Sequence, residues 1–289
     1  MWVIKTIKSW KFWLTLLLAP MLLVGCSSLF IDFNSDFIND DFIARENVQA
    51  DDISLSYLRS GDPIGQRVIF LHGTPGDAGG NWVRMLKSVP EGYEFIAIDR
   101  PGFGHTKPRS AVTSLDDQAA VLEPLLVVRG GRGTILVGHS LGGPIIAAAA
   151  ANYPESVAGI VMAAGALDPD LEDVLFIQYV GNVPPFSWLL DKTLRNSNKE
   201  LIALEDELRL LQPKLAGITQ PVMIVHGTMD ELVPYKNVAF MQREFTGTRH
   251  LEVTKLEGMN HFLQWNKNAE IFAAVKTIVA VLNASQSAR

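Results

Sequence analysis

The sequence predicts an α/β fold in which a mostly parallel sheet is covered by helices on both faces. After Glu46, short runs rich in β-branched residues alternate with longer stretches whose apolar residues recur at helical spacing. Nearly half of the 289 residues (48%) are apolar, which is enough to bury a large core. The predicted strands are Ile53–Arg59, Arg67–Leu71, Phe95–Ile98, Thr134–Gly138, Val157–Met162, Pro221–Val225 and Leu251–Thr254.

The predicted helices lie between these strands, as expected for parallel pairing. We expect the catalytic or binding core to be formed by residues 46–164 and 218–289. Its predicted helices are Asn81–Ser88, Leu115–Val128, Leu141–Asn152, Tyr235–Phe245 and Ala269–Leu282.

One long interval, from Ala164 to Gln220, contains no convincing strand. Two stretches in it, Asp170–Tyr179 and Lys199–Leu211, have helical spacing. Ligands of an α/β sheet bind beyond the carboxyl ends of its strands, so an insertion that leaves such an end would cover the site. The sequence therefore predicts a helical lid formed by residues 165–217.

The charge of the chain argues against nucleic acid as a partner. The net charge is −6, from 25 basic and 31 acidic side chains, and the only basic cluster is Lys5, Lys8 and Lys11. An acidic protein without a basic stripe repels phosphate backbones. We also find no His/Cys cluster with metal-ligand spacing and no phosphate-binding loop, so no metal or nucleotide cofactor is expected.

The N-terminus has the features of an export signal. Three lysines precede the apolar run Phe12–Val24, which is too short to span a bilayer as a helix. The run ends in Leu23-Val24-Gly25-Cys26, which resembles the bacterial lipobox, and Cys26 is the only cysteine. We expect removal of residues 1–25 and attachment of acyl chains to Cys26. The alternative is an ordinary secretory signal with an incidental or buried cysteine.

This resemblance implies a location in the bacterial cell envelope. Ser27 and Ser28 follow the cysteine, whereas lipoproteins kept at an inner membrane often have aspartate there, so the outer membrane is the expected site. Residues 26–45 would then connect the lipid to the folded domain. Four phenylalanines in this strap are expected to pin it to the domain, with partner docking as the alternative: Phe30, Phe33, Phe37 and Phe42.

The strongest local pattern is Gly138-His139-Ser140-Leu141-Gly142, directly after an apolar run and before an alanine-rich helical stretch. A sharp turn from strand to helix needs glycines where Cβ atoms would clash, and it exposes the serine hydroxyl. The amides at the start of the helix favour negative charge on a reacting oxygen. We predict that Ser140 is a nucleophile; the alternative is a serine that only caps the helix.

Together with two other motifs, this pattern resembles the α/β-hydrolase superfamily. His72-Gly73-Thr74-Pro75-Gly76 and Asp99-Arg100-Pro101-Gly102-Phe103-Gly104 each follow a predicted strand, in the order typical of that family. The resemblance covers nearly all of residues 46–285 and implies the α/β-hydrolase fold. It also implies an oxyanion hole made by the amides of Thr74 and Leu141, and structural roles for His72 and Asp99.

The family order of serine, acid and histidine locates the other two catalytic residues. Asp230 follows the predicted strand that ends at Val225, with Glu231 as a competitor of longer reach. His261 lies in a glycine-containing loop before the last helix, where the family has its base. A base and a carboxylate are needed because a serine hydroxyl is a poor nucleophile by itself.

These residues predict cleavage of carboxylic esters through an acyl-enzyme, acting on small-molecule or lipid esters. The apolar lid side chains could bind an acyl chain, although at least half of them are expected to pack on the core: Phe176, Tyr179, Pro184, Pro185, Phe186 and Trp188. Alternatives are a lipase or lysophospholipase, an aminopeptidase or a C–C hydrolase. A non-catalytic envelope binding protein on the same fold is a further alternative.

Overall fold

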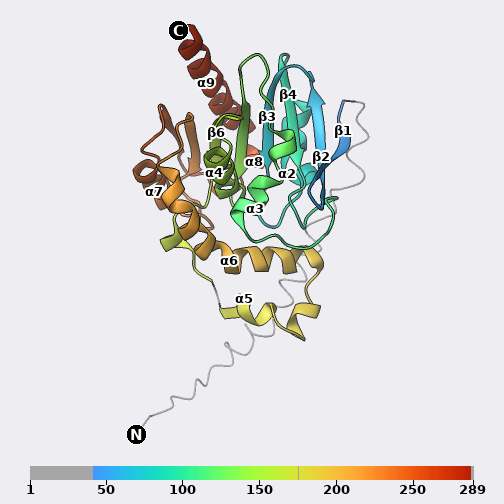
Figure 1. The fold of residues 1–289 in the computed structure, drawn as a ribbon. Coiled ribbons are helices and arrows are strands. Elements are labelled where there is room, and N and C mark those ends of the chain that lie inside the picture. The colour runs from blue at the N-terminus through green and yellow to red at the C-terminus, as the bar shows by residue number, and fades with distance from the viewer. Residues whose placement is uncertain (1–41, 175, 288–289) are drawn as a thin grey trace. The chain divides into compact units, whose positions relative to one another are not determined.

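The computed structural model describes residues 42–174 and 176–287 of the chain (Figure 1). An eight-stranded sheet forms its centre, in the spatial order β1-β2-β4-β3-β5-β6-β7-β8. The first two pairings, β1 with β2 and β2 with β4, are antiparallel, and all others are parallel. The strands are β1 (Ala44–Ala50), β2 (Ile53–Gly61), β3 (Gln66–Leu71), β4 (Tyr93–Ile98), β5 (Thr134–His139), β6 (Val157–Ala163), β7 (Val222–Gly227) and β8 (Leu251–Leu256).

Helices lie against both faces of the sheet, so the predicted mostly parallel α/β architecture is confirmed. On one face α2, α8 and α9 pack together, and on the other α3 and α4 pack together with α6 beside α4. The helices of the core are α2 (Ala78–Lys87), α3 (Leu115–Ala120), α4 (Gly142–Asn152), α7 (Lys236–Glu244), α8 (Leu263–Asn266) and α9 (Asn268–Ser287), with the short η1 (Glu123–Leu125).

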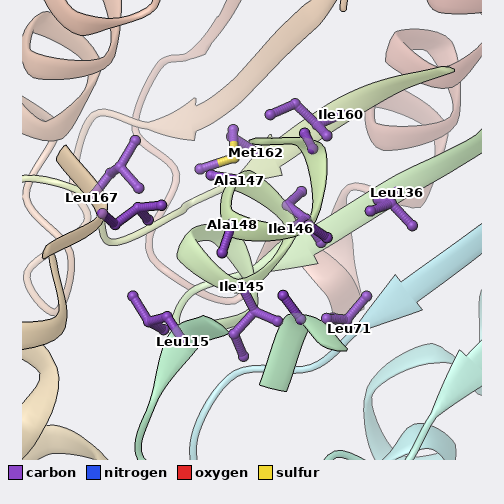
Figure 2. Close-up of a cluster of buried hydrophobic side chains, with 14 of the residues drawn as sticks. Leu71, Leu115, Leu136, Ile145, Ile146, Ala147, Ala148, Ile160, Met162 and Leu167 are labelled. Atoms are coloured by element: carbon purple, nitrogen blue, oxygen red, sulfur yellow. The ribbon is translucent and has the colours of Figure 1, made fainter. Parts of the chain in front are cut away.

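The main apolar core centres on α4, which is buried along its first nine residues. Figure 2 shows Ile145, Ile146 and Ala148 of α4 among side chains of β5 and β6. Small alanines let the helix lie close to the sheet, while the isoleucines fill the space between them. This close packing fixes the position of the residues that precede α4.

Between β6 and β7 the chain forms a helical insertion of η2 (Pro169–Leu171), α5 (Phe176–Gly181), η3 (Phe186–Trp188) and the 24-residue α6 (Lys192–Leu215). Figure 1 shows α6 below the carboxyl ends of the strands and α5 further outward. The first predicted helix of this region is shorter than expected, and the second is longer.

Three further expectations differ from the structure. Strand β1 was not predicted, because its polar sequence ARENVQA lacks the alternation that marks a half-buried strand. The helix expected over Leu115–Val128 ends at Ala120, and the 3-10 turn after it contains Pro124. Phe42, expected to pack against the domain, is 82% exposed, so that part of the strap prediction is wrong. Cys26 and the other three phenylalanines lie outside the described residues.

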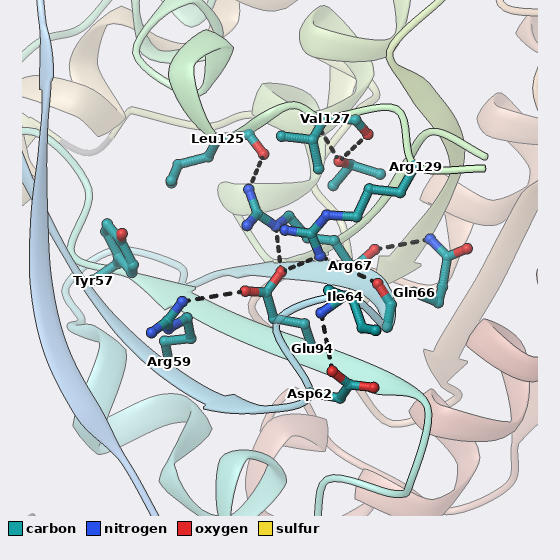
Figure 3. Close-up of polar contacts among 12 residues, drawn as sticks. Tyr57, Arg59, Asp62, Ile64, Gln66, Arg67, Glu94, Leu125, Val127 and Arg129 are labelled. Carbon is teal, nitrogen blue, oxygen red and sulfur yellow. Dashed lines mark hydrogen bonds and ion pairs between the residues drawn. The ribbon is translucent and has the colours of Figure 1, made fainter. Parts of the chain in front are cut away.

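At the amino ends of the parallel strands, Figure 3 shows a cluster of charges around the buried Glu94. Its Oε2 accepts from Arg67 at 2.6 Å and from Arg129 at 2.7 Å, while Arg59 lies 3.7 Å from Oε1. A buried carboxylate is tolerated when cations and hydrogen bonds replace its water. This cluster joins β2, β3, β4 and the turn before β5 at the edge opposite α6.

No helix in the described part of the chain is long and apolar enough to cross a membrane.

Candidate active site

Ser140 occupies a strained turn between β5 and α4. Its φ is +55°, a conformation that non-glycine residues adopt rarely. The strain is maintained by backbone hydrogen bonds: the Ser140 amide donates to Ala163 at 3.1 Å, and the Ser140 carbonyl accepts from Gly143 at 2.9 Å. A Cβ on Gly138 would lie 2.3 Å from the Gly142 carbonyl oxygen, so glycine is required there. The steric clash that the sequence analysis expected at a glycine of this turn is therefore present at Gly138.

Asp230 and His261 meet in the loops after the neighbouring strands β7 and β8. Nδ1 of His261 lies 2.8 Å from Oδ2 of Asp230, and both residues are buried. The other carboxylate oxygen, Oδ1, accepts from the amides of Leu232 at 3.0 Å and Val233 at 2.8 Å. Glu231, the competitor, is exposed. Asp230 is therefore the acid that holds this imidazole.

The structure does not place the Ser140 hydroxyl in a hydrogen bond with His261. It connects the two residues through His139, which precedes Ser140 and whose ring centroid lies 4.7 Å from that of His261. Of the three predicted residues, Asp230 and His261 are thus in direct contact, and Ser140 is joined to them through its neighbour. Hydrogen bonds of this kind often close only when substrate is bound.

His139 is a site residue that the sequence did not identify. Its Nε2 lies 3.0 Å from the His261 carbonyl oxygen, and because a carbonyl only accepts, Nε2 carries the proton. Burial lowers the pKa of His139 to about 3, with a further contribution from the nearby His261, so its ring is neutral at pH 7. Its Nδ1 is buried and has no hydrogen-bond partner among the described residues. His139 fixes the backbone of the residue that carries the imidazole.

The loop that begins with His72 lies directly beside Ser140. A Cβ on Gly73 would lie 2.8 Å from the Ser140 Cβ and 3.3 Å from its Oγ, so only glycine fits. This contact places the loop that contains Thr74 against the turn that contains Leu141. In the turns and loops of the described chain, the backbone amides of Thr74 and Leu141 donate to no other backbone group.

His72 is held in place by hydrogen bonds through both ring nitrogens. Nδ1 lies 2.7 Å from the Gly73 carbonyl oxygen and donates to it, while Nε2 accepts from the Arg100 amide at 3.1 Å. Burial, together with the positive charge of Arg100, lowers the pKa of His72 to about 3. A neutral, fully engaged ring agrees with the structural role expected for this histidine.

Arg100 connects this loop to the helical insertion, and the sequence did not predict this contact. Its Nε donates to the His72 carbonyl and its Nη2 to the Gly73 carbonyl, both at 2.9 Å. The same guanidinium forms a bidentate ion pair with Glu200 of α6, at 2.7 and 3.1 Å, and donates to Gln118 at 2.6 Å. Arg100 and Glu200 are both buried. The loop beside Ser140 is therefore fixed to α6 by one buried ion pair.

Asp99 stabilises the neighbouring loop. It is buried and accepts from the amides of Ala78 at 2.8 Å and His105 at 2.9 Å, and from Arg45 at 2.6 Å. Burial would raise the pKa of Asp99, but the hydrogen bonds from His105 and the charge of Arg45 lower it to about 2. The carboxylate has no free oxygen for a substrate, in agreement with its predicted structural role.

Among the described residues, no group of three or more His, Cys, Asp or Glu is arranged to hold a metal ion.

Comparisons with known proteins identify the fold. Residues 66–196 match the family model described as the alpha/beta hydrolase fold. A non-heme chloroperoxidase of Streptomyces lividans is 28% identical over 253 residues, covering 73% of this chain and 91% of that protein. The acetyltransferase component of the acetoin cleaving system of Cupriavidus necator is 30% identical over 145 residues. That match covers 44% of this chain and only 38% of the relative.

Other curated relatives are named as lipases and as a proline iminopeptidase. Among solved structures, one described as a membrane phospholipase A superimposes with a TM-score of 0.62 at 21% identity, covering 91% of this chain and 94% of that one. These names span several reactions on one architecture. The chain has the α/β-hydrolase fold, and these comparisons support its place in the α/β-hydrolase superfamily, with Ser140 at the turn from β5 into α4.

Proposed function

We propose that the protein is a serine hydrolase that cleaves carboxylic esters through an acyl-enzyme, with Ser140, His261 and Asp230 as its catalytic triad. The observation that carries this proposal is the 2.8 Å contact between His261 Nδ1 and Asp230 Oδ2, in loops after adjacent strands of the sheet that holds Ser140. An imidazole held by a buried carboxylate beside a strained serine is the arrangement that activates a hydroxyl.

The hydrogen bonds of Asp230 define which nitrogen of His261 acts as the base. Because Asp230 already accepts from two backbone amides, its Oδ2 is an acceptor for the Nδ1–H of His261. The lone pair is therefore on Nε2. In the first step Nε2 takes the Ser140 proton while Oγ attacks the ester carbonyl carbon, and Nε2–H then protonates the departing alcohol. Water, activated by the same nitrogen, releases the acid from the acyl-enzyme.

Backbone amides would stabilise the negative oxygen formed by this attack. The amides of Thr74 and Leu141 belong to the two segments that the Gly73 contact holds against Ser140. An oxyanion donor of this kind contributes on the order of 3 kcal/mol to transition-state stabilisation. We assign these two amides to the oxyanion hole.

Several relatives are named as lipases, which favours an ester over an amide or a C–C bond. The exposed apolar surface of the insertion favours a lipid ester among these. The insertion that crosses the carboxyl ends of the strands carries exposed apolar side chains, including Phe176 and Trp188. The six insertion side chains expected to pack at least in part on the core are all exposed, which corrects that expectation: Phe176, Tyr179, Pro184, Pro185, Phe186 and Trp188.

A lipid anchor at Cys26 completes the proposal. It rests on the lipobox-like sequence alone and would hold the enzyme at a membrane of the bacterial cell envelope. Two or three acyl chains suffice for stable anchoring, since each buried methylene contributes about 0.8 kcal/mol. Metabolic labelling with a clickable palmitate analogue should tag the wild-type protein, and a Cys26→Ser variant that was tagged equally would contradict this assignment.

The proposed reaction can be tested with a fluorophosphonate probe and a series of p-nitrophenyl esters. We expect the probe to label the protein at Ser140 and the Ser140→Ala variant to remain unlabelled. We also expect hydrolysis of at least part of the series. Preference for long acyl chains would support a lipid substrate, and activity on acetate or butyrate alone would favour small esters. An unlabelled, inactive wild-type protein would instead indicate a non-catalytic binding protein.

A Gly73→Ala variant tests the position of the oxyanion loop. The new Cβ would lie 2.8 Å from the Ser140 Cβ, so the loop must shift, and we expect kcat for ester hydrolysis to fall about 100-fold or more. Gly217→Ala is the matched control, because its Cβ would meet only the Lys214 carbonyl oxygen at an ordinary 3.4 Å. Equal activity of the two variants would contradict the assigned loop position.

A further inference from the structure

The most unusual surface of the described chain is the segment 176–190, which contains no charged side chain. Elsewhere, large exposed apolar side chains occur singly or in pairs along the chain. In this segment six are at least half exposed, and Phe176, Trp188 and Leu189 are exposed by 80%, 71% and 73%. Contiguous apolar surface on a folded domain usually marks a contact with a partner or a membrane. The six side chains are Phe176, Tyr179, Val183, Phe186, Trp188 and Leu189.

The segment lies on the outer side of the insertion. Figure 1 shows α5 and the turn after it beyond α6, on the side away from the sheet. A hydrogen bond of 2.7 Å from Asn198 of α6 to the Gln178 carbonyl fixes α5 to α6. This bond holds α5 against α6, while the six large apolar side chains of the segment remain at least half exposed.

A row of cations on α6 follows this segment in the chain. Lys192, Arg195 and Lys199 follow one another at spacings of three and four residues, so they lie on one face of α6. None of the three forms an ion pair with a described residue. The nearest acid in sequence, Asp191, caps the helix by accepting from the Leu194 amide at 3.0 Å. Uncovered aromatic side chains beside unpaired cations form an amphipathic surface.

We propose that residues 176–190 and the three cations of α6 form a membrane-binding surface on which the domain lies against a lipid bilayer. Tryptophan and tyrosine favour the boundary between headgroups and acyl chains, and lysine and arginine bind the phosphates of anionic lipids. α6 then lies between the bilayer and the carboxyl ends of the strands, where Ser140 is located. The proposal concerns attachment and does not depend on which bond the enzyme cleaves.

Two observations favour a bilayer over a second copy of the chain. In a symmetric dimer through this segment, the same row of cations would be repeated on both partners at the contact, which is unfavourable. In addition, only fifteen residues lie between the expected lipid attachment site, Cys26, and Phe42. A chain of that length reaches at most about 55 Å, so an anchored domain remains close to the bilayer.

A fluorophore on the segment would report docking directly. The full chain has one cysteine, so a Cys26→Ser background carrying Leu189→Cys accepts a single nitrobenzoxadiazole label. Ile64→Cys is the matched control, because Ile64 is 83% exposed and lies before β3, at the opposite edge of the sheet. Vesicles of ether-linked phosphatidylcholine and phosphatidylglycerol, containing spin-labelled lipids as quenchers, avoid any change caused by ester hydrolysis.

We expect the label at position 189 to shift to shorter wavelength and to lie about 5–10 Å below the headgroup boundary, while the label at 64 stays in water. Replacing Lys192 and Lys199 by alanine should lower the ratio of docked to undocked protein about fivefold for each charge removed. Equal quenching at positions 189 and 64 would overturn the proposal. So would a shift at 189 that needs no vesicles and grows with protein concentration, which would show that a second copy covers the segment.

Discussion

Replacing Ser140 by alanine is expected to reduce kcat for ester hydrolysis about a millionfold, with little change in the free energy of unfolding. The hydroxyl is the proposed nucleophile, and a serine protease with the same relay loses about this much when its serine or histidine is removed. Alanine keeps the backbone that holds the strained turn, whose hydrogen bonds to Ala163 and Gly143 use main-chain atoms only. The measurement is a steady-state assay with a p-nitrophenyl ester, together with urea unfolding.

The same relay predicts how variants combine. His261→Ala alone should cost about as much as Ser140→Ala, and the double variant should cost no more than either, since the two residues act as a unit. Asp230→Asn should lose about 10⁴-fold, because the amide allows the wrong tautomer of His261. Losses that multiply in the double variant would show that the two residues act separately and would contradict the proposed triad.

The turn at Ser140 could be predicted from sequence because its requirements are largely local. Gly138 is needed because its Cβ would meet the Gly142 carbonyl oxygen within the turn itself, and the strand before the turn and the helix after it have clear apolar patterns. Gly142 is needed for a distant reason, because its Cβ would lie 2.7 Å from the Leu71 carbonyl oxygen. The order of the acid and the base could be predicted only through the resemblance to the family. What no pattern showed is that His139, adjacent to the serine, would hold the backbone of His261.

The elements that were missed or misjudged are those whose structure depends on distant partners. Strand β1 is polar and is defined by its antiparallel pairing with β2, which a sequence window does not detect. The contact of Arg100 with Glu200 joins residues 100 positions apart. One signal was available: Glu200 falls in register with the buried leucines of α6, and an acid on the apolar face of a helix requires a buried partner. The buried leucines are Leu204, Leu208, Leu211 and Leu215.

Removing the charge of Glu200 is expected to destabilise the fold strongly. A Glu200→Gln variant keeps the shape of the side chain but leaves the buried guanidinium of Arg100 without a counter-ion. Breaking a buried pair in this way costs about 3–5 kcal/mol in the free energy of unfolding. Glu205→Gln on the same helix is the control, since it removes only the exposed pair with Arg209 and should have a much smaller effect.

A double variant, Arg100→Met with Glu200→Leu, separates stability from catalysis. Apolar side chains of similar volume often replace a buried ion pair without loss, so the free energy of unfolding should recover most of what Glu200→Gln loses. The hydrogen bonds from Arg100 to the carbonyls of His72 and Gly73 would still be missing, and the loop beside Ser140 would lose its support. We therefore expect kcat to stay at least tenfold below wild type, because small displacements of an oxyanion donor are costly. Recovery of both stability and full activity would mean that the ion pair only stabilises the fold and does not position the loop.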